Sequence, residues 1–238
     1  MKKLLLGIAA VCLAGFTFAQ DAPLWMRHSV ISPDGTTIAF TYKGDIYTVP
    51  VAGGRAMQIT TNPAYDTAPV WSPDSKRIAF ASDRMGSLDV YIVAKDGGEP
   101  RRLTTHSGSE TPLAFTDAGH VLFSAGIMPS AEAVVFPSNG QFNQVYRVSV
   151  EGGRPTMISS MPMECISINK EGAMLYQDKK GYEDYWRKHH VSPIARDIWM
   201  YTPGKEPQYR QLTTFGGEDR EPVWAPDGKT FYYLSEEN

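Results

Sequence analysis

Two adjacent arginines, Arg101 and Arg102, are the side chains of this 238-residue chain best suited to holding an anionic ligand. Guanidinium groups bind carboxylates through two parallel hydrogen bonds, so the pair could form a carboxylate clamp. However, the pair stands at the start of a short strand that the sequence repeats. The other repeats have Met57-Gln58, Thr156-Met157 and Arg210-Gln211 at this place. We therefore favour a solvated pair of strand residues over a clamp.

Two adjacent histidines, His189 and His190, could bind a metal ion. Neighbouring side chains of a strand point to opposite faces, and no third ligand is spaced to join them, so we expect no metal. The segment Gly228-Lys229-Thr230 resembles the end of a phosphate-binding loop, but the first glycine of such a loop would fall at Val223. The internal repeat predicts a hairpin turn there instead. We expect no cofactor.

The sequence lacks the motifs that commonly place a catalytic nucleophile or a catalytic zinc ion. Neither Gly-x-Ser-x-Gly nor His-Glu-x-x-His occurs, and the dinucleotide-binding pattern Gly-x-Gly-x-x-Gly is also missing. We therefore expect no catalytic residue in this chain. Cys165 stands beside Ile166, and its apolar neighbours predict a buried core thiol rather than a reactive one.

The most unusual segment, residues 178–196, interleaves aromatic side chains with charges of both signs. Tyr, Trp and Arg dominate the binding hot spots of protein interfaces, so this segment predicts contact with a substrate or with another domain. The candidate residues are Tyr182, Tyr185, Trp186, Arg187, His189, His190 and Arg196. A second interpretation stays open, in which the segment is a solvated hairpin folded over its own repeat. Another insertion, from Ala125 to Asn143, could line the same end of the fold as this segment.

These candidates belong to a repeating series of strand-sized segments. A Pro-Asp turn precedes an apolar strand three times, at Pro33-Asp34, Pro73-Asp74 and Pro226-Asp227. The aligned aromatics, which recur at intervals of roughly 40 to 57 residues, are Phe40, Phe80, Phe123, Tyr176 and Tyr233. Each complete repeat continues with a third strand that resembles Asp-Ile-Tyr and a fourth that resembles Leu-Thr-Thr.

Repeats of this length and strand content predict a β-propeller. Pro, Asp and Gly favour tight turns between antiparallel strands, and a sheet that is apolar on both faces must stack on its neighbours. We predict an all-β, incomplete propeller of four-stranded antiparallel blades, about four and a half in number. The predicted repeats are roughly 26–65, 66–107, 108–160, 161–215 and a truncated 216–238. Because the last repeat stops after its second strand, we expect the chain to be the front part of a longer polypeptide.

The N-terminal segment predicts export to the periplasm. Lys2 and Lys3 precede an apolar run over residues 4–18, and small residues would allow cleavage after Ala19. The run is shorter than a comfortable membrane span, so we interpret residues 1–19 as a signal peptide rather than a retained anchor. We expect no membrane association after cleavage.

The charge of the chain argues against a nucleic-acid partner. Residues 1–19 contain two of the 23 basic residues and none of the 26 acidic ones, so the remaining chain has a net charge of −5. No basic stripe accompanies the aromatic residues, and phosphate binding depends on such a stripe.

The repeats resemble those of a known group of propellers. Ser-Pro-Asp-Gly turns combined with Asp-Ile-Tyr and Leu-Thr-Thr strands are similar to repeats shared by TolB, by the prolyl oligopeptidase and dipeptidyl peptidase group, and by the tricorn proteases. The segment from Tyr182 to His190, the following Arg196-Asp197-Ile198-Trp199 and the opening Pro23-Leu24-Trp25-Met26-Arg27 resemble exported bacterial tricorn homologues.

The tricorn resemblance implies a large serine peptidase of the tail-specific protease class that cleaves oligopeptides. It also implies that the catalytic residues lie in a core beyond Asn238, and that the propeller forms a channel that filters or guides peptides. The implied partners are peptides and the downstream domains of the same polypeptide, with a possible homo-oligomer of the full protein. Two alternatives stay open: a TolB-like binding propeller without a peptidase core, and the propeller of a dipeptidyl-peptidase-like enzyme.

Overall fold

The computed structural model describes residues 25–126, 143–180 and 191–237, and in these residues the secondary structure is β-strand without helices. Eighteen strands form four four-stranded sheets and one two-stranded sheet, each with its strands in chain order and antiparallel. The described part of the chain has no helix of the length and apolarity needed to span a membrane. The predicted all-β fold of four-stranded blades is confirmed.

The strands of the first two blades are β1 (Arg27–Ile31), β2 (Thr37–Tyr42), β3 (Asp45–Pro50), β4 (Met57–Gln58), β5 (Asp66–Trp71), β6 (Arg77–Ser82), β7 (Asp89–Ala94) and β8 (Arg101–Arg102). The third and fourth blades consist of β9 (Glu110–Asp117), β10 (His120–Ala125), β11 (Gln144–Ser149), β12 (Thr156–Ser159), β13 (Met163–Ile168), β14 (Met174–Asp178), β15 (Ile198–Thr202) and β16 (Gln208–Gln211). The two-stranded fifth sheet pairs β17 (Asp219–Trp224) with β18 (Phe231–Ser235).

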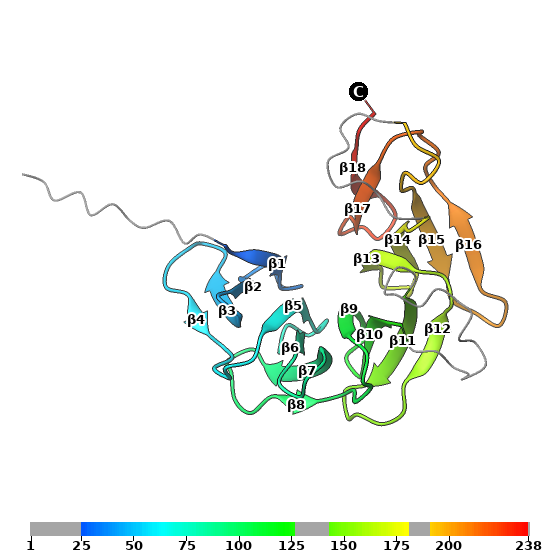
Figure 1. The fold of residues 1–238 in the computed structure, drawn as a ribbon. Helices are drawn as coiled ribbons and strands as arrows, with labels where there is room; N and C mark the ends of the chain where they lie inside the picture. Colours follow the sequence, from blue (N-terminus) through cyan, green and yellow to red (C-terminus); the bar gives the residue numbers. More distant parts are fainter. Residues whose placement is uncertain (1–24, 127–142, 181–190, 238) are drawn as a thin grey trace, which may run out of the picture.

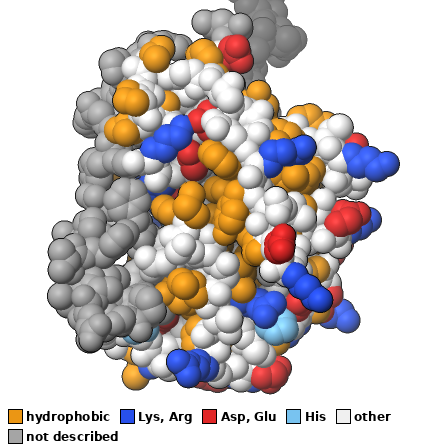
Figure 2. Space-filling model, turned by 90° about the vertical axis from the view of Figure 1, so that its right-hand side faces the viewer, with side chains coloured by type: hydrophobic (Ala, Val, Ile, Leu, Met, Phe, Trp, Pro, Cys, Tyr) orange, Lys and Arg blue, Asp and Glu red, His pale blue; other side chains and the backbone are white. Residues whose placement is uncertain are grey.

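The sheets stand side by side in an arc, with the first strand of each sheet on the inner edge and the fourth on the outer edge (Figure 1). The first strands contact one another in sequence, β1 with β5, β5 with β9, β9 with β13 and β13 with β17. Figure 2 shows the side of the molecule that lies at the right in Figure 1, where hydrophobic side chains lie between scattered charges. Met157 and Tyr209 are among the exposed large hydrophobic residues of the outer strands β12 and β16.

The hydrophobic core is divided into clusters that join neighbouring blades. One cluster combines Ala39 and Ile46 of the first blade with Trp71 and Ile78 of the second. Two further clusters join the second blade to the third and the third to the fourth. Because each sheet buries its faces against its neighbours, the blades stabilise one another rather than folding around separate cores.

The repeated aromatics explain how each blade is packed internally. In the first three blades, the aromatic residue of the second strand stacks on the tyrosine of the third strand, with the two rings nearly parallel. The pairs are Phe40–Tyr47 at 5.9 Å, Phe80–Tyr91 at 5.9 Å and Phe123–Tyr146 at 5.6 Å between ring centroids. Offset stacking at this separation is a favourable aromatic geometry.

The Pro-Asp turns between first and second strands are held by the aspartate side chain. The Ser32 hydroxyl donates to Asp34 Oδ1 at 2.6 Å, and the backbone N–H of Thr36 donates to the same oxygen at 3.0 Å. These bonds lower the pKa of Asp34 to about 2. In the fifth sheet, Asp227 accepts the backbone N–H groups of Lys229 and Thr230, so the expected hairpin turn at Gly228-Lys229-Thr230 is present.

Candidate functional site

The two insertions noted in the sequence leave the propeller from one end of the sheets. Asp66, the first residue of β5, pairs with Ser82, the last residue of β6, and the third, fourth and fifth sheets have the same register. The connections from second to third strands therefore start where the first strands start. We call this the insert end, because residues 127–142 and 181–190 lie in two of these connections.

Buried carboxylates lie at the insert end of the blades. Asp66, Glu110 and Asp219 each begin a first strand, and each is at most 1 % exposed. Arg84, in the connection after β6, donates from one nitrogen to both carboxylate oxygens of Asp66 at 3.1 Å. The same guanidinium lies over the Tyr91 ring at 4.4 Å from its centroid. The Arg84 guanidinium therefore offsets part of the free-energy cost of burying the Asp66 carboxylate.

In the first, second and fourth blades, an aspartate at the start of the third strand or just before it contacts the fourth strand. Three blades show this contact: Gln58 donates to Asp45 at 3.0 Å, Arg102 pairs with the buried Asp89 at 2.8 Å, and Gln211 donates to Asp197 at 3.0 Å. Arg102 is therefore an internal ion-pair partner. The prediction of a solvated pair holds only in part for this residue, since its side chain is 29 % exposed while its partner Asp89 is fully buried.

Arg101 and Arg102 do not form a carboxylate clamp, because their guanidinium groups have separate partners. Arg101 pairs with Glu151 of the third blade at 2.8 Å and donates to the Val150 carbonyl, whereas Arg102 is directed to Asp89 within its own blade. The two arginines therefore act as separate strand residues, which is the interpretation that the sequence favoured over a clamp.

A second buried acid, Glu110, lies close to Asp89. Burial is the largest influence on Glu110, and together with the nearby negative charge of Asp89 it raises the pKa of Glu110 to about 7. Glu110 is 1 % exposed and its carboxyl group therefore gains protons far more readily than an exposed glutamate. The insert end thus contains a carboxyl group that changes charge near neutral pH.

Of the candidate residues in the long insertion, the structure describes Arg196, which lies between the fourth and fifth blades. Its Nε is 3.5 Å from Glu164 Oε2 on β13, and its Nη1 is 3.5 Å from Glu218 Oε1, just before β17. Lys179 also pairs with Glu164, at 3.1 Å. Burial raises the pKa of Glu164, but the charge and hydrogen bond of Lys179 outweigh burial and lower it overall. Arg196 therefore links two blades.

The two stems of the long insertion are joined by a lysine. Lys180, on the rising stem, pairs with Asp178 at 3.6 Å and contacts the Asp197 carboxylate and the Ala195 carbonyl on the returning stem. Asp178 also accepts the Asp197 backbone N–H at 2.8 Å. These contacts fix where the segment leaves and re-enters the fourth blade.

The remaining candidates of this segment lie outside the described residues. They are Tyr182, Tyr185, Trp186, Arg187, His189 and His190. The prediction for the insertion from Ala125 to Asn143 rests mostly on residues 127–142, which also lie outside the described residues. Within the described ranges, no group of three or more His, Cys, Asp or Glu side chains is placed to hold a metal ion.

The inner strands share a left-handed bulge. His28, Ala68, Cys165 and Glu221 lie near the start of their strands, at the second residue of β1 and the third residue of β5, β13 and β17, and have φ between 51° and 53°. The pairing with the second strand shifts register at each of these places. Non-glycine residues rarely adopt this conformation, so its recurrence marks a shared feature of the inner edge.

The third blade departs from this pattern. Pro112 stands at the equivalent place in β9, and proline cannot adopt a positive φ. The pairing of β9 with β10 shifts register at two places, between His120 and Val121 and between Leu122 and Phe123 of β10.

Cys165 lies at one of these inner bulges and is half-buried, rather than part of the core as predicted. Burial is the main reason that its pKa rises to about 12, and the nearby carboxylate of Glu221 adds to the effect. The thiol is therefore protonated at neutral pH and is a poor nucleophile.

The inner strands carry charged residues of both signs: Arg27, His28, Glu164, Arg220 and Glu221. The His28 Nδ1 lies 3.1 Å from the Thr67 hydroxyl of the next blade, and burial together with the Arg27 charge lowers the pKa of His28. An edge of mixed charge can contact a polypeptide, which offers amide groups, an ammonium and a carboxylate.

Sequence reasoning missed Arg84, Asp66, Asp89 and Glu110. An indication existed in the acidic residue that starts several first strands, since Asp66, Glu110 and Asp219 each stand two or three residues before the proline of the same strand. The partner of Asp66 could not be found in this way, because Arg84 lies in a connection of variable length.

The fold and the inner edge define a β-propeller region, and comparison with known sequences identifies its family. The sequence profile described as "Tricorn protease N-terminal beta propeller domain" matches residues 23–238. The chain belongs to this family.

The chain is also similar in sequence to two curated proteins. "Tricorn protease homolog 1" of Streptomyces coelicolor is 24% identical over 211 residues, which cover 88% of this chain and 19% of that protein. "Uncharacterized peptidase YuxL" of Bacillus subtilis is 30% identical over 231 residues, or 96% of this chain and 31% of that protein. The chain therefore spans less than a third of either relative.

The structure described as putative TolB from Agrobacterium tumefaciens superposes with a TM-score of 0.68 at 17% identity, covering 89% of this chain and 70% of the other. At this identity the likeness concerns the fold.

Proposed function

We propose that this chain is the N-terminal propeller region of an exported serine-type peptidase that degrades oligopeptides, and that the propeller receives and guides the peptides. The observation that carries this proposal is the match of the tricorn propeller family across residues 23–238. The names of two relatives, a tricorn protease homologue and a peptidase, support the same class of activity. Peptides and the other domains of the full polypeptide are the proposed partners.

The inner edge supports a guiding role. Charges of both signs occur on the first strands. At the insert end, Arg196 connects the fourth and fifth blades, and Arg84 pairs with Asp66 within the second blade. A peptide that passes along this edge meets fixed charges suited to its termini and side chains, and electrostatic complementarity favours encounter more than tight binding. Weak binding suits a segment that must release peptides to a catalytic domain.

Export is proposed from residues 1–19, which combine two lysines, an apolar run and a small-residue cleavage site. The measurement is the N-terminal sequence of the protein recovered from the periplasm of the producing cells. A mature protein that starts at Gln20 supports export, and a cytoplasmic protein that keeps Met1 refutes it.

The peptidase class is tested by the gene beyond codon 238. A PDZ domain followed by a tail-specific protease core is the expected result. A Gly-x-Ser-x-Gly elbow in an α/β-hydrolase domain would instead indicate a dipeptidyl-peptidase-like enzyme, and a stop codon after one or two further blades would indicate a binding propeller.

Peptide binding by the purified chain tests the guiding role directly. Fluorescence anisotropy of labelled oligopeptides should show saturable binding without cleavage, and Arg27→Glu, on the exposed part of β1, should change the affinity. Arg210→Glu, on the outer strand β16, is the matched control and should leave it unchanged. Equal effects of the two reversals would contradict binding at the inner edge.

A further inference from the structure

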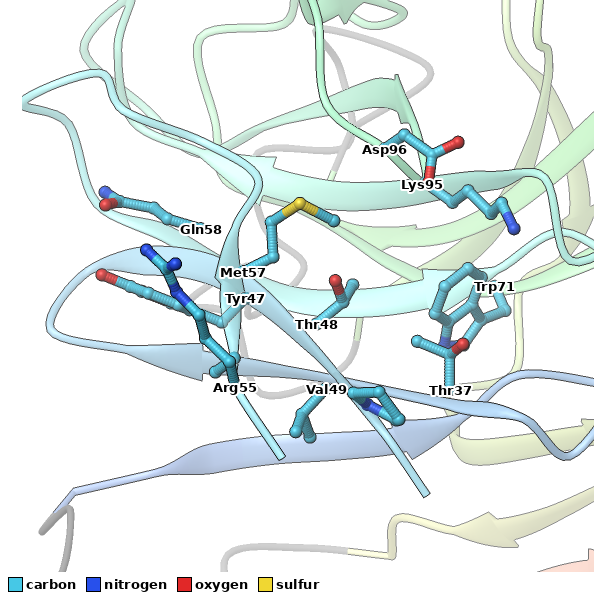
Figure 3. Close-up of a pocket in the computed structure, with 12 residues that line it drawn as sticks. Thr37, Tyr47, Thr48, Val49, Arg55, Met57, Gln58, Trp71, Lys95 and Asp96 are labelled. Carbon is cyan, nitrogen blue, oxygen red and sulfur yellow. The ribbon is translucent and has the colours of Figure 1, made fainter. Parts of the chain in front are cut away.

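A pocket of about 730 Å³ lies between the first and second blades. Its walls come from β3, from the chain around β4, from Trp71 at the end of β5 and from the turn after β7 that carries Lys95 and Asp96 (Figure 3). The pocket lies toward the end of the sheets that holds the hairpin turns, opposite to the insert end. It is therefore separate from the charged contacts described above.

The next groove along the arc, between the second and third blades, is crossed by two arginines. Arg101 on β8 reaches the third blade, where it pairs with Glu151 at 2.8 Å and donates to the Val150 carbonyl. Arg77 on β6 donates to the Ala118 carbonyl of the same blade. Guanidinium groups thus bridge this groove from two positions.

The strand registers identify the equivalent residues in the first groove. Met57 pairs with Thr48 on β3 as Arg101 pairs with Ile92 on β7, so Met57 stands in the place of Arg101. Thr37 pairs with Pro50 as Arg77 pairs with Ala94, so Thr37 stands in the place of Arg77. Neither side chain carries a charge, and neither can make the contacts that the arginines make.

The receiving side of the groove keeps its acidic residue. Lys95 and Asp96 precede Gly97-Gly98 as Val150 and Glu151 precede Gly152-Gly153, so Asp96 takes the place of Glu151. The first groove therefore presents a carboxylate and a carbonyl at the positions that bind Arg101 in the second groove, with an open pocket where the guanidinium and its stem would lie.

The walls of the pocket suit the stem and the planar head of an arginine. Trp71 donates its indole N–H to the Val30 carbonyl at 3.2 Å, so its polar edge is occupied and the ring forms a wall. Met57 is 49 % exposed and projects toward the turn that carries Lys95 and Asp96 (Figure 3). Guanidinium groups stack well on aromatic rings and pair with carboxylates in a fixed geometry.

The two cationic residues of the lining leave the carboxylate accessible. Arg55 lies beside Gln58 and Tyr47, at the other end of the pocket from Asp96 (Figure 3). The ammonium of Lys95 acts on Asp34 of the neighbouring turn, where its charge contributes to the low pKa of that carboxylate.

We propose that this pocket binds an arginine side chain of a polypeptide, with the guanidinium on the Asp96 carboxylate and the Lys95 carbonyl and the stem along Met57 and Trp71. The occupant would supply from outside the contact that Arg101 supplies from within the chain at the next groove. This site goes beyond the proposed guiding role, because it lies at the opposite end of the sheets and does not depend on the inner edge.

The test uses two small probes that differ in charge but hardly in shape, N-acetylarginine amide and N-acetylcitrulline amide. Each is titrated into the ¹⁵N-labelled chain while the indole N–H signal of Trp71, assigned through Trp71→Phe, is followed by NMR. The arginine probe should shift this signal saturably, and the citrulline probe should bind at least about tenfold more weakly, because charge-assisted hydrogen bonds are roughly twice as strong as neutral ones. Equal affinities, or no saturable shift with the arginine probe, would overturn the proposal.

Two variants test whether the arginine probe binds in this pocket. Met57→Arg should fill the pocket with its own guanidinium, pair with Asp96, and abolish binding while the chain still unfolds cooperatively. Asp96→Asn should weaken binding of the arginine probe at least about tenfold. Met161→Arg, which changes another exposed methionine, is the matched control and should bind like the original chain. A Met57→Arg variant that folds and binds the probe unchanged would refute the site.

Discussion

Arg84 contacts both carboxylate oxygens of Asp66 at 3.1 Å, and Asp66 is fully buried at the start of the inner strand β5. Replacement of Arg84 by alanine would leave that carboxylate buried without its partner. Removal of one member of a buried pair is strongly destabilising, and we expect the free energy of unfolding of Arg84→Ala to fall by about 3–5 kcal/mol in urea titrations. Arg210→Ala, exposed on β16, should change it by less than about 0.5 kcal/mol. Similar stabilities for the two variants would contradict a structural role for the pair.

Glu110 makes the stability of the fold depend on pH near neutrality. Its pKa rises from 4.5 to about 7, so the folded state favours the protonated form. The contribution of this group is therefore fully favourable below pH 4.5, declines as the pH rises, and levels off above about 7, with a total change of about 3 kcal/mol. Glu110→Gln should remove this decline, measured as the difference in unfolding free energy between pH 5 and pH 8.

The exposed Glu99→Gln is the control for that experiment and should retain the decline. If Glu110→Gln and the original chain lose stability equally between the two pH values, the burial and charge assigned to Glu110 are wrong.

Asp34 should titrate at an unusually low pH. The Ser32 hydroxyl is the first cause of its pKa of about 2, followed by the backbone and hydroxyl of Thr36. Because the folded pKa is depressed, the contribution of Asp34 to stability is present above its ordinary pKa of 3.8 and is lost as the pH falls through about 2. NMR titration of the carboxyl carbon should show the pKa of Asp34 rising in Ser32→Ala and staying low in Ser72→Ala, which alters the equivalent turn of the second blade.

Cys165 should react slowly with disulfide reagents. Its pKa of about 12 leaves little thiolate at pH 8, and the thiolate is the reactive form. In a Cys12→Ser variant, where Cys165 is the remaining cysteine, we expect native protein to react with dithionitrobenzoate at least about a hundredfold more slowly than protein unfolded in urea. Equal rates in the two states would show that the inner edge does not protect the thiol.

The blades could be predicted from the sequence because their determinants are local. A Pro-Asp turn is closed by its own aspartate, as at Asp34, and the aromatic of one strand stacks on the tyrosine of the next, as in Phe80–Tyr91. Such features repeat whenever the local sequence repeats, so their spacing indicates both the strands and their order.

The long-range contacts of the buried charges could not be predicted in the same way. Arg84 and Asp66 meet through a connection that has no counterpart of equal length in other blades, and Arg102 pairs with a buried acid that looked like an ordinary strand residue. The pocket beside Met57 arises from a difference between two grooves, which becomes visible when the registers are compared. Of the predicted interface residues, Arg196 is described, and it joins two blades.

The most direct test of peptide guiding is a site-specific photocrosslink. Benzoylphenylalanine is placed either at Thr111, on the inner strand β9, or at Tyr209, on the outer strand β16. After irradiation with labelled oligopeptide, we expect covalent adducts at position 111 and none above background at position 209. Adducts at position 209 alone, or equal adducts at both positions, would contradict the claim that peptides travel along the inner edge of the propeller.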